Sequence, residues 1–331
     1  GQGYWGPKLT RNYVDLLGVD HVRNADFSDK RLQDVVGYYP EIKTTQDGQE
    51  LIDSNEVDAI VIATPVHTHY PLAKKALMGG KHVIVEKPLT SQAYQAQELV
   101  ALAKSKGLVL MVGHTYVFNP AVEALREIIK SNELGEVYYI YSKRVNLGLL
   151  QPDINVMWDL APHDISILCY ILDEYPEKVT AFGGNFINHT SNKAEVVFMN
   201  LRFSSGVLVN IRLSWLDPVK QRKMTVVGAN KMLVYDDIAE DKIILYDKGV
   251  EVPPYSLTLN EFKASYRHGD EEVYPFEWVE PLRSECDNFI QSIVNGKEPR
   301  SDGKEGLNIV KILESAQRSL DNGGVELKIE Y

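Results

Sequence analysis

An apolar segment in the first third of the chain ends in the tripeptide Glu86-Lys87-Pro88. The residues before it, Lys81-His-Val-Ile-Val85, predict a buried strand, and ligands of open α/β sheets bind just beyond such strand ends. Pro88 restricts Lys87 to an extended backbone and has no N–H of its own. An ammonium held there could hydrogen-bond a reacting oxygen or, if desolvated, act as a base. The alternative is a surface lysine before a turn, because lysine is usually exposed.

Asp159 and His163 form a second pair of side chains that could take part in catalysis, and they lie four residues apart. We predict that they open a helix running to about Leu172, where this spacing puts both side chains on one face. Pro162 would be tolerated in the first helical turn. A carboxylate that holds an imidazole gives a base whose ordinary pKa of about 6.5 suits proton transfer near neutrality. The alternative is a capping aspartate beside a structural histidine.

The chain starts with Gly1-Gln-Gly3-Tyr-Trp-Gly6-Pro7, a G-x-G-x-x-G string. Such a string binds a pyrophosphate when it joins a strand to a helix, because backbone N–H groups and the helix dipole meet the anion. Pro7 suits a first helical turn, and apolar residues recur after it at helical spacing. The strand before the loop is missing from the sequence, so we expect roughly 5–10 more residues of apolar strand to precede Gly1.

Asp26 follows Gly6 by 20 positions, which is where the dinucleotide fingerprint places an acidic residue. A carboxylate there binds the adenosine ribose hydroxyls of NAD and repels the 2′-phosphate of NADP. Lys30 and Arg31 lie nearby and leave NADP open as a second cofactor. The alternative is a solvated acid in a loop.

The elements that would position these groups change in character along the chain. Up to residue 116, apolar segments alternate with helical ones. We expect strands over 57–65, 81–88 and 108–114, and helices over 70–78 and from an N-cap at Ser91 to Lys106. This alternation predicts βαβ units and a doubly wound parallel sheet, that is, an α/β Rossmann domain over residues 1–116.

From residue 117 on, strand signals dominate. A helix is expected over 120–130, and strands over 137–146, 179–187, 194–203, 207–215, 224–227 and 231–235. Ser204-Ser205-Gly206 and Gly228-Ala229-Asn230 read as hairpin turns. Consecutive hairpins predict a mostly antiparallel sheet in an α+β domain over residues 117–331. Two late helices, 282–294 and 304–320, could cover either domain.

Composition excludes several classes of function. The 331 residues carry a net charge of -11, which argues against a nucleic-acid surface. No apolar stretch reaches the roughly 18 residues of a membrane span, so we expect no membrane contact and a cytoplasmic location. Cys169 and Cys286 lie in apolar helical patterns and indicate buried hydrophobic side chains. The sequon Asn188-His-Thr190 is interpreted as chance, since no secretory signal accompanies it. A metal site could be considered at three histidines, His67, His69 and His114. No Cys or carboxylate spacing supports such a site, so we expect no metal.

In combination, these motifs resemble the Gfo/Idh/MocA (glucose–fructose oxidoreductase/inositol dehydrogenase) family over nearly the whole chain. The glycine loop, Ala63-Thr-Pro65 with Thr68-His69, Glu86-Lys-Pro88 and Asp159-x-x-x-His163 occur in one order. The resemblance implies a Rossmann domain and a second domain with a large open sheet, whose face forms a homodimer or homotetramer interface. It also implies NAD(P)-dependent hydride transfer between nicotinamide C4 and a sugar carbinol or ketone.

The same resemblance implies roles for individual residues. The catalytic positions would be Lys87, Asp159 and His163. The cofactor-binding positions would be Gly1, Gly3, Tyr4, Trp5, Gly6, Asp26, Thr64, Pro65, His67, His69, Glu86 and Lys87. The substrate-binding positions would be Tyr116, Arg144, Asn155 and His163. The family's Lys-Pro bond is often cis, so we expect a cis Lys87–Pro88 bond, although cis is a minority even before proline.

Four segments further resemble a nucleotide-sugar 3-dehydrogenase branch, whose enzymes oxidise UDP-N-acetylglucosamine or its uronic acid: Gly3–Pro7, Arg144–Gly148, Asn155–Asp164 and Ser214–Lys220. The branch implies a site for the diphosphate of the substrate, and a basic cluster could supply it: Lys220, Arg222 and Lys223. The alternative is that this cluster is a solvated strand end. The alternatives are an inositol or simple-sugar dehydrogenase on the same scaffold and a non-catalytic NAD-binding sensor, because fold alone does not decide function. Whether His163 or Lys87 is the base stays open.

Overall fold

The computed structural model describes residues 1–151, 153–187, 193–251 and 264–331, so the sequon at Asn188 lies outside them. The chain divides into two compact units, Gly1–Phe118 with Val279–Glu314, and Asn119–Trp278 with Ser315–Tyr331. The first division falls close to the expected boundary at residue 116. The segment 279–314 groups with the first unit, whereas a single boundary would assign it to the second. The physical reason is that α8 (Pro281–Asn295) packs on α1 (Gly6–Leu17) and on the 3₁₀ turn η2 (Thr115–Phe118).

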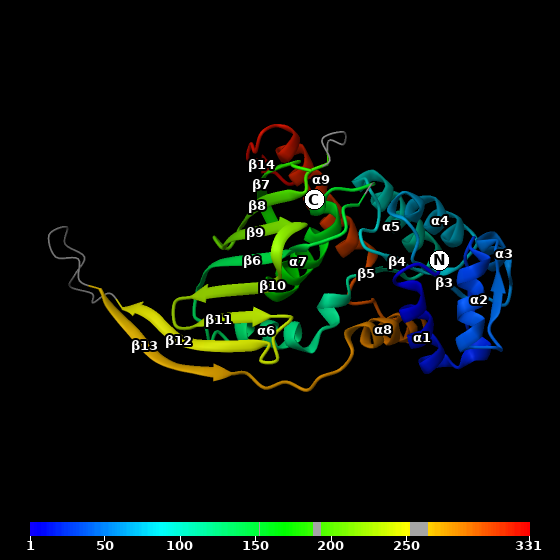
Figure 1. Ribbon diagram of the computed structural model, residues 1–331, viewed down its shortest axis with the longest axis horizontal. Coiled ribbons are helices and arrows are strands. Elements are labelled where there is room, and N and C mark those ends of the chain that lie inside the picture. The colour runs from blue at the N-terminus through cyan, green and yellow to red at the C-terminus, as the bar shows by residue number, and fades with distance from the viewer. Residues whose placement is uncertain (152, 188–192, 252–263) are drawn as a thin grey trace. The chain divides into compact units, whose positions relative to one another are not determined.

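The first unit contains parallel strands in two ladders (Figure 1). β1 (Arg23–Ala25) pairs with β2 (Lys43–Thr45), after the short 3₁₀ turn η1 (Val19–His21). β3 (Ala59–Ile62), β4 (His82–Glu86) and β5 (Leu110–Gly113) form the second ladder, with β4 in the middle. The apolar interior of β4 is buried, as a parallel strand covered on both faces requires. The predicted alternation of parallel strands and helices is therefore confirmed.

The helices of the first unit differ from expectation at their starts. They are α1, α2 (Asp29–Tyr38), α3 (Gly48–Asp53), α4 (Val66–Met78), α5 (Ala93–Lys106) and α8, with the first part of α9 (Gly303–Asp321). α4 begins before residue 70, so His67 and His69 lie in its first turns and not in a loop. The prediction of Ser91 as the cap of α5 is wrong. The N-cap is Gln92, and the Ala93 N–H donates to the Glu314 carboxylate at 2.8 Å, a partner that is distant in the sequence.

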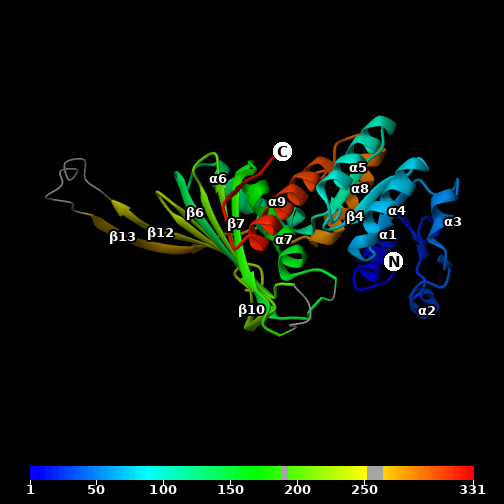
Figure 2. The same ribbon diagram turned by 90° about the horizontal axis from the view of Figure 1, so that it is seen from above.

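The second unit is built on a nine-stranded sheet in the order β13-β12-β11-β10-β6-β9-β8-β7-β14. Its strands are β6 (Val137–Leu147), β7 (Pro176–Gly184), β8 (Val196–Phe203), β9 (Leu208–Ser214), β10 (Leu216–Gly228), β11 (Met232–Asp236), β12 (Ile243–Glu251), β13 (Ser265–Val273) and β14 (Leu327–Lys328). Every pair is antiparallel except β6 with β9. The large, mostly antiparallel sheet is thus confirmed, and its strands splay with the usual twist (Figure 2).

The two faces of this sheet have different environments. Val197, Met199 and Leu201 of β8 are buried on the face that α7 (Val156–Leu172) covers, with α6 (Pro120–Lys130) packed beside α7. The alternate residues point to the other face, which carries a hollow of about 460 Å³. That hollow is lined by side chains such as Tyr139, Tyr141, Thr180, Asn200, Leu208 and Asn210. One face is therefore core and the other is surface in this chain.

Two further expectations concern cysteines and membranes. Cys169 and Cys286 are both buried and no disulfide joins them, as predicted. Within the four described stretches of chain, none of the helices combines the length and the apolar character needed to cross a bilayer.

Candidate active site

The glycine loop forms a tight cradle at the start of α1. A Cβ on Gly6 would lie 2.2 Å from the Gly1 carbonyl oxygen, closer than any real side chain allows. A Cβ on Gly3, in contrast, would meet no atom of the described residues within 4 Å. Gly6 is therefore required by the loop itself, whereas Gly3 leaves the backbone open to an approaching ligand. With α1 beginning directly at Gly6, this arrangement fits a pyrophosphate.

Asp26 is held beside this cradle. Its carboxylate accepts hydrogen bonds from the Gln2 N–H at 2.6 Å and the Ser28 N–H at 2.8 Å, and the Arg31 guanidinium lies 3.5 Å away. Burial raises the pKa of Asp26, but the two N–H donors and Arg31 outweigh it and hold the pKa below its ordinary value of 3.8. A carboxylate oriented at this place fits the ribose hydroxyls of NAD. The Arg31 guanidinium is already paired with the Asp26 carboxylate.

Lys8 is a residue of this region that the sequence interpretation missed. Its ammonium lies 3.9 Å from the Tyr4 ring centroid and 4.5 Å from that of Trp5. The Tyr4 side chain is 78% exposed. A cation in the first turn of α1 adds positive charge at the helix N-terminus, where the cradle would receive a phosphate. The available signal was a lysine directly after Pro7.

The predicted cis bond between Lys87 and Pro88 is confirmed. Lys87 follows β4, and the loop that carries it is tied to the loop after β3 by His69. The His69 ring is buried, with Nδ1 2.8 Å from the Pro88 carbonyl oxygen and Nε2 2.8 Å from that of Thr64. Burial lowers the pKa of His69, although both carbonyl contacts oppose that change. Because both nitrogens face backbone carbonyls, this side chain is placed to position the two loops; its direct cofactor contact stays a prediction.

The other residues of this region vary in exposure. Thr64 bonds Thr68 through their hydroxyls at 2.6 Å, whereas Pro65 and His67 are exposed at the start of α4. Tyr116 lies in η2 and is half-buried. Glu86, the last residue of β4, has a pKa that burial raises to about 7, against the attraction of Lys87. The first unit thus contains the cradle, Asp26, the Thr64 loop and the Lys87 loop that were expected to contact the cofactor.

In the second unit, Asp159 and His163 lie four residues apart on α7, as predicted. The helix starts at Val156 because the Asn155 side chain caps it, accepting from the Trp158 N–H at 3.1 Å. Pro162 consequently lies in the second turn, and the expectation that it falls in the first is wrong. The Trp215 indole N–H donates to the Asp159 carboxylate at 3.3 Å. This bond orients the carboxylate that is expected to hold His163.

Asn155 has a second tie that bears on its expected role. Its amide donates to the Gln317 side chain at 2.8 Å, and the Trp158 indole donates to the same oxygen at 3.1 Å. The side chain therefore both caps α7 and joins it to α9. A substrate contact by Asn155 stays a prediction.

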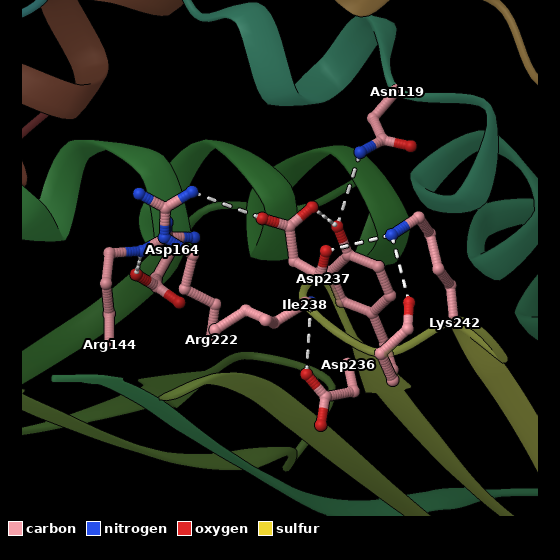
Figure 3. A network of polar contacts seen from close by, with 10 residues as sticks. Asn119, Arg144, Asp164, Arg222, Asp236, Asp237, Ile238 and Lys242 are labelled. Atoms are coloured by element: carbon pink, nitrogen blue, oxygen red, sulfur yellow. Dashed lines mark hydrogen bonds and ion pairs between the residues drawn. The ribbon is translucent and has the colours of Figure 1, made fainter. Parts of the chain in front are cut away.

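Arg144 forms a buried ion pair that fastens α7 to the sheet (Figure 3). Its Nε donates to Asp164 at 2.5 Å, and the Ser142 hydroxyl donates to the other oxygen of the same carboxylate at 2.5 Å. The side chains of Arg144 and Asp164 are 5% and 3% exposed. Substrate contact by Arg144 stays a prediction, whereas its contact with the residue after His163 is direct.

Two of the three residues in the basic cluster on β10, Arg222 and Lys223, form ion pairs within the second unit. Arg222 stands opposite Arg144 in the ladder, where like charges repel, and lies 3.3 Å from Asp237. Lys223 pairs with Asp236 at 3.1 Å. Figure 3 shows Asp237 among Arg222, Lys242 and Asn119. This arrangement favours the strand-end interpretation of the cluster over diphosphate binding.

The fold and the cradle together define an α/β protein with a dinucleotide-binding Rossmann unit and a second unit built on a large open sheet. Residues 1–114 match the model of the oxidoreductase family with an NAD-binding Rossmann fold, and residues 122–234 match the GFO/IDH/MocA C-terminal domain. The chain belongs to the Gfo/Idh/MocA family of NAD-dependent oxidoreductases.

Relatives with assigned activities act on different substrates. The chain is 25% identical over 258 residues to UDP-N-acetylglucosamine 3-dehydrogenase of Acidithiobacillus ferrooxidans, covering 77% of this chain and 76% of the relative. It is 22% identical to myo-inositol 2-dehydrogenase of Thermotoga maritima, covering 90% and 87%. Among solved structures, GenD2 from gentamicin A biosynthesis, in complex with NAD, aligns with a TM-score of 0.82 at 21% identity, over 100% of this chain and 95% of that one.

Proposed function

We propose that this protein is an NAD-dependent dehydrogenase that oxidises a sugar carbinol, most specifically C3 of a UDP-linked amino sugar. The observation that carries the proposal is the set of titratable side chains Lys87, Asp159 and His163, which a sensor would not need. The cradle at Gly3 and the oriented Asp26 support NAD as cofactor. Similarity to UDP-N-acetylglucosamine 3-dehydrogenase supports the choice of sugar.

Oxidation of a carbinol removes a hydroxyl proton while a hydride leaves the carbon. Bound NAD would supply the hydride acceptor, held by the glycine cradle at its pyrophosphate and by Asp26 at its ribose. His163 accepts the hydroxyl proton in this proposal, and Asp159 orients the imidazole and strengthens it as a base. Lys87 donates a hydrogen bond to the reacting oxygen and stabilises the negative charge that develops there.

The substrate is tested with a panel of nucleotide sugars, free sugars and inositols, followed by the appearance of NADH absorbance. We expect turnover with UDP-linked amino sugars. Turnover with inositol or free sugars alone would replace the proposed substrate with the simple-sugar alternative. NAD binding without turnover of any member would favour the sensor.

The residue roles are tested with His163→Ala and Lys87→Ala, each compared with the exposed His21→Ala as a control. Loss of a general base or of a charge-stabilising donor costs on the order of 100-fold in kcat. We expect the limb of the pH–rate profile that belongs to the base to disappear in His163→Ala and to persist in Lys87→Ala. Wild-type turnover in both variants would refute the assignment.

The outer face of the nine-stranded sheet is proposed as the interface of a homodimer or homotetramer. It exposes apolar side chains of neighbouring strands, with Tyr139 44% and Leu208 50% exposed around the hollow. Exposed apolar patches of this kind commonly mark protein interfaces. Leu208→Glu should convert the oligomer to monomers in sedimentation experiments, and a monomeric wild-type protein would contradict the proposal.

A further inference from the structure

Trp215 is the single residue between β9 and β10, and its indole meets a side chain of α7. The residue is 3% exposed, and its indole N–H donates to Oδ2 of Asp159 at 3.3 Å. An indole nitrogen can only donate a hydrogen bond, so this oxygen must offer it a lone pair. That bond fixes the rotation of the Asp159 carboxylate about its Cβ–Cγ bond.

The backbone of Trp215 is held on both sides. Its N–H donates to the Glu195 carbonyl oxygen at 3.1 Å, and its own carbonyl oxygen accepts from the Gly148 N–H at 2.9 Å. The residue before Glu195 supports α7, because the Ala194 carbonyl oxygen accepts from the N–H of Val156, the first residue of the helix, at 3.1 Å. One dipeptide therefore holds both the indole and the helix that carries the carboxylate, so the distance between donor and acceptor depends on a shared support.

The space for the indole depends on the glycine at position 148. A Cβ on Gly148 would lie 3.0 Å from Cδ1 of Trp215, the ring atom bonded to the donor nitrogen. A contact this short would require the ring to move by a few tenths of an ångström. The same Cβ would lie 2.9 Å from the Asn146 amide nitrogen, at the end of a side chain that can turn aside. Gly148→Ala is therefore a way to displace the indole while its N–H is kept.

We propose that Trp215 is a positioning residue for the base: its indole N–H fixes the Asp159 carboxylate in the orientation that accepts a hydrogen bond from the His163 imidazole. This role rests on the proposed function in taking Asp159 as the partner of His163, four residues further along α7. A neutral imidazole carries one proton, and the nitrogen that donates to Asp159 leaves the other nitrogen as the acceptor. Through Asp159, the indole thus selects the tautomer of His163 that can take a hydroxyl proton.

The tautomer is measured by NMR of the purified protein labelled with ¹⁵N-histidine, at a pH where imidazoles are neutral, because the nitrogen shifts separate protonated from unprotonated ring nitrogens. His163→Gln assigns the resonances of this residue among the eight histidines. We expect one tautomer in the wild type and a mixture of both in Trp215→Phe, which keeps an aromatic ring without the N–H. Trp158→Phe is the matched control. The Trp158 indole, on the same helix as His163, donates to Gln317 at 3.1 Å, and its loss should leave the tautomer unchanged.

Gly148→Ala is a milder second variant, and it should show a smaller share of the second tautomer. A single, wild-type tautomer in Trp215→Phe, or the same mixture in Trp158→Phe, would overturn the proposed role; if Trp215→Phe does not fold, a wild-type tautomer in Gly148→Ala would do so. These spectra require no substrate, so they do not depend on whether the proposed dehydrogenase activity is found. With a substrate, kcat of Trp215→Phe should fall about 10- to 100-fold, as expected for loss of a hydrogen bond to a charged group, while KM stays near that of the wild type.

Discussion

Glu86→Gln should change how the stability of the protein depends on pH. In the folded protein burial raises the pKa of Glu86 from its ordinary value of 4.5 to about 7. Between these two values the folded state binds more protons than the unfolded state, so the free energy of unfolding falls as pH rises. Each unit of pKa corresponds to 1.36 kcal/mol. The wild-type protein should therefore lose about 3 kcal/mol of stability from this group between pH 4.5 and 7.

Glutamine removes this titration while it keeps the size of the side chain. The free energy of unfolding of Glu86→Gln, measured relative to the wild type by urea titration and circular dichroism, should rise by about 3 kcal/mol between pH 4.5 and 7.5. Glu41→Gln changes an exposed carboxyl of the same unit and serves as the control. A difference between Glu86→Gln and wild type that is the same at every pH would refute the reasoning.

Two further substitutions test the glycine cradle and the anchor of α7. Gly6→Ala should weaken NAD binding, measured by calorimetry, at least about tenfold (about 1.4 kcal/mol), because the new Cβ would meet the Gly1 carbonyl oxygen. Gly37→Ala is the control and should bind NAD as the wild type does, because a Cβ on Gly37 would meet no atom of the described residues within 4 Å. Asp164→Asn should destabilise the protein to urea by about 3 kcal/mol, since it leaves Arg144 buried without its counter-charge. The ion pair between Arg126 and the exposed Asp173 serves as the control, and Asp173→Asn should lower the free energy of unfolding by less than about 1 kcal/mol.

The sequence determined those features whose causes lie within a few residues. The helix 120–130 was predicted with the bounds it has from its amphipathic pattern. In the structure the Asn119 side chain caps it and Pro120 is its first residue, so both causes are local. The i, i+4 placement of Asp159 and His163 followed in the same way from one helix. The family motifs led to the cis Lys87–Pro88 bond, and the strand–helix alternation and the hairpin signals led to the division between parallel and antiparallel sheets.

Only the tertiary structure decided which distant groups meet. The carboxylate of Glu314 caps α5 in place of Ser91, and Asp164 forms a buried ion pair with Arg144. Glu285 gave no signal as a residue of an ordinary amphipathic helix, yet it is fully buried, and neither of its oxygens has a hydrogen-bond partner among the described residues. Local periodicity fixes which face of an element is buried, whereas burial of a charge and the choice of its partner depend on what the rest of the fold packs against that face.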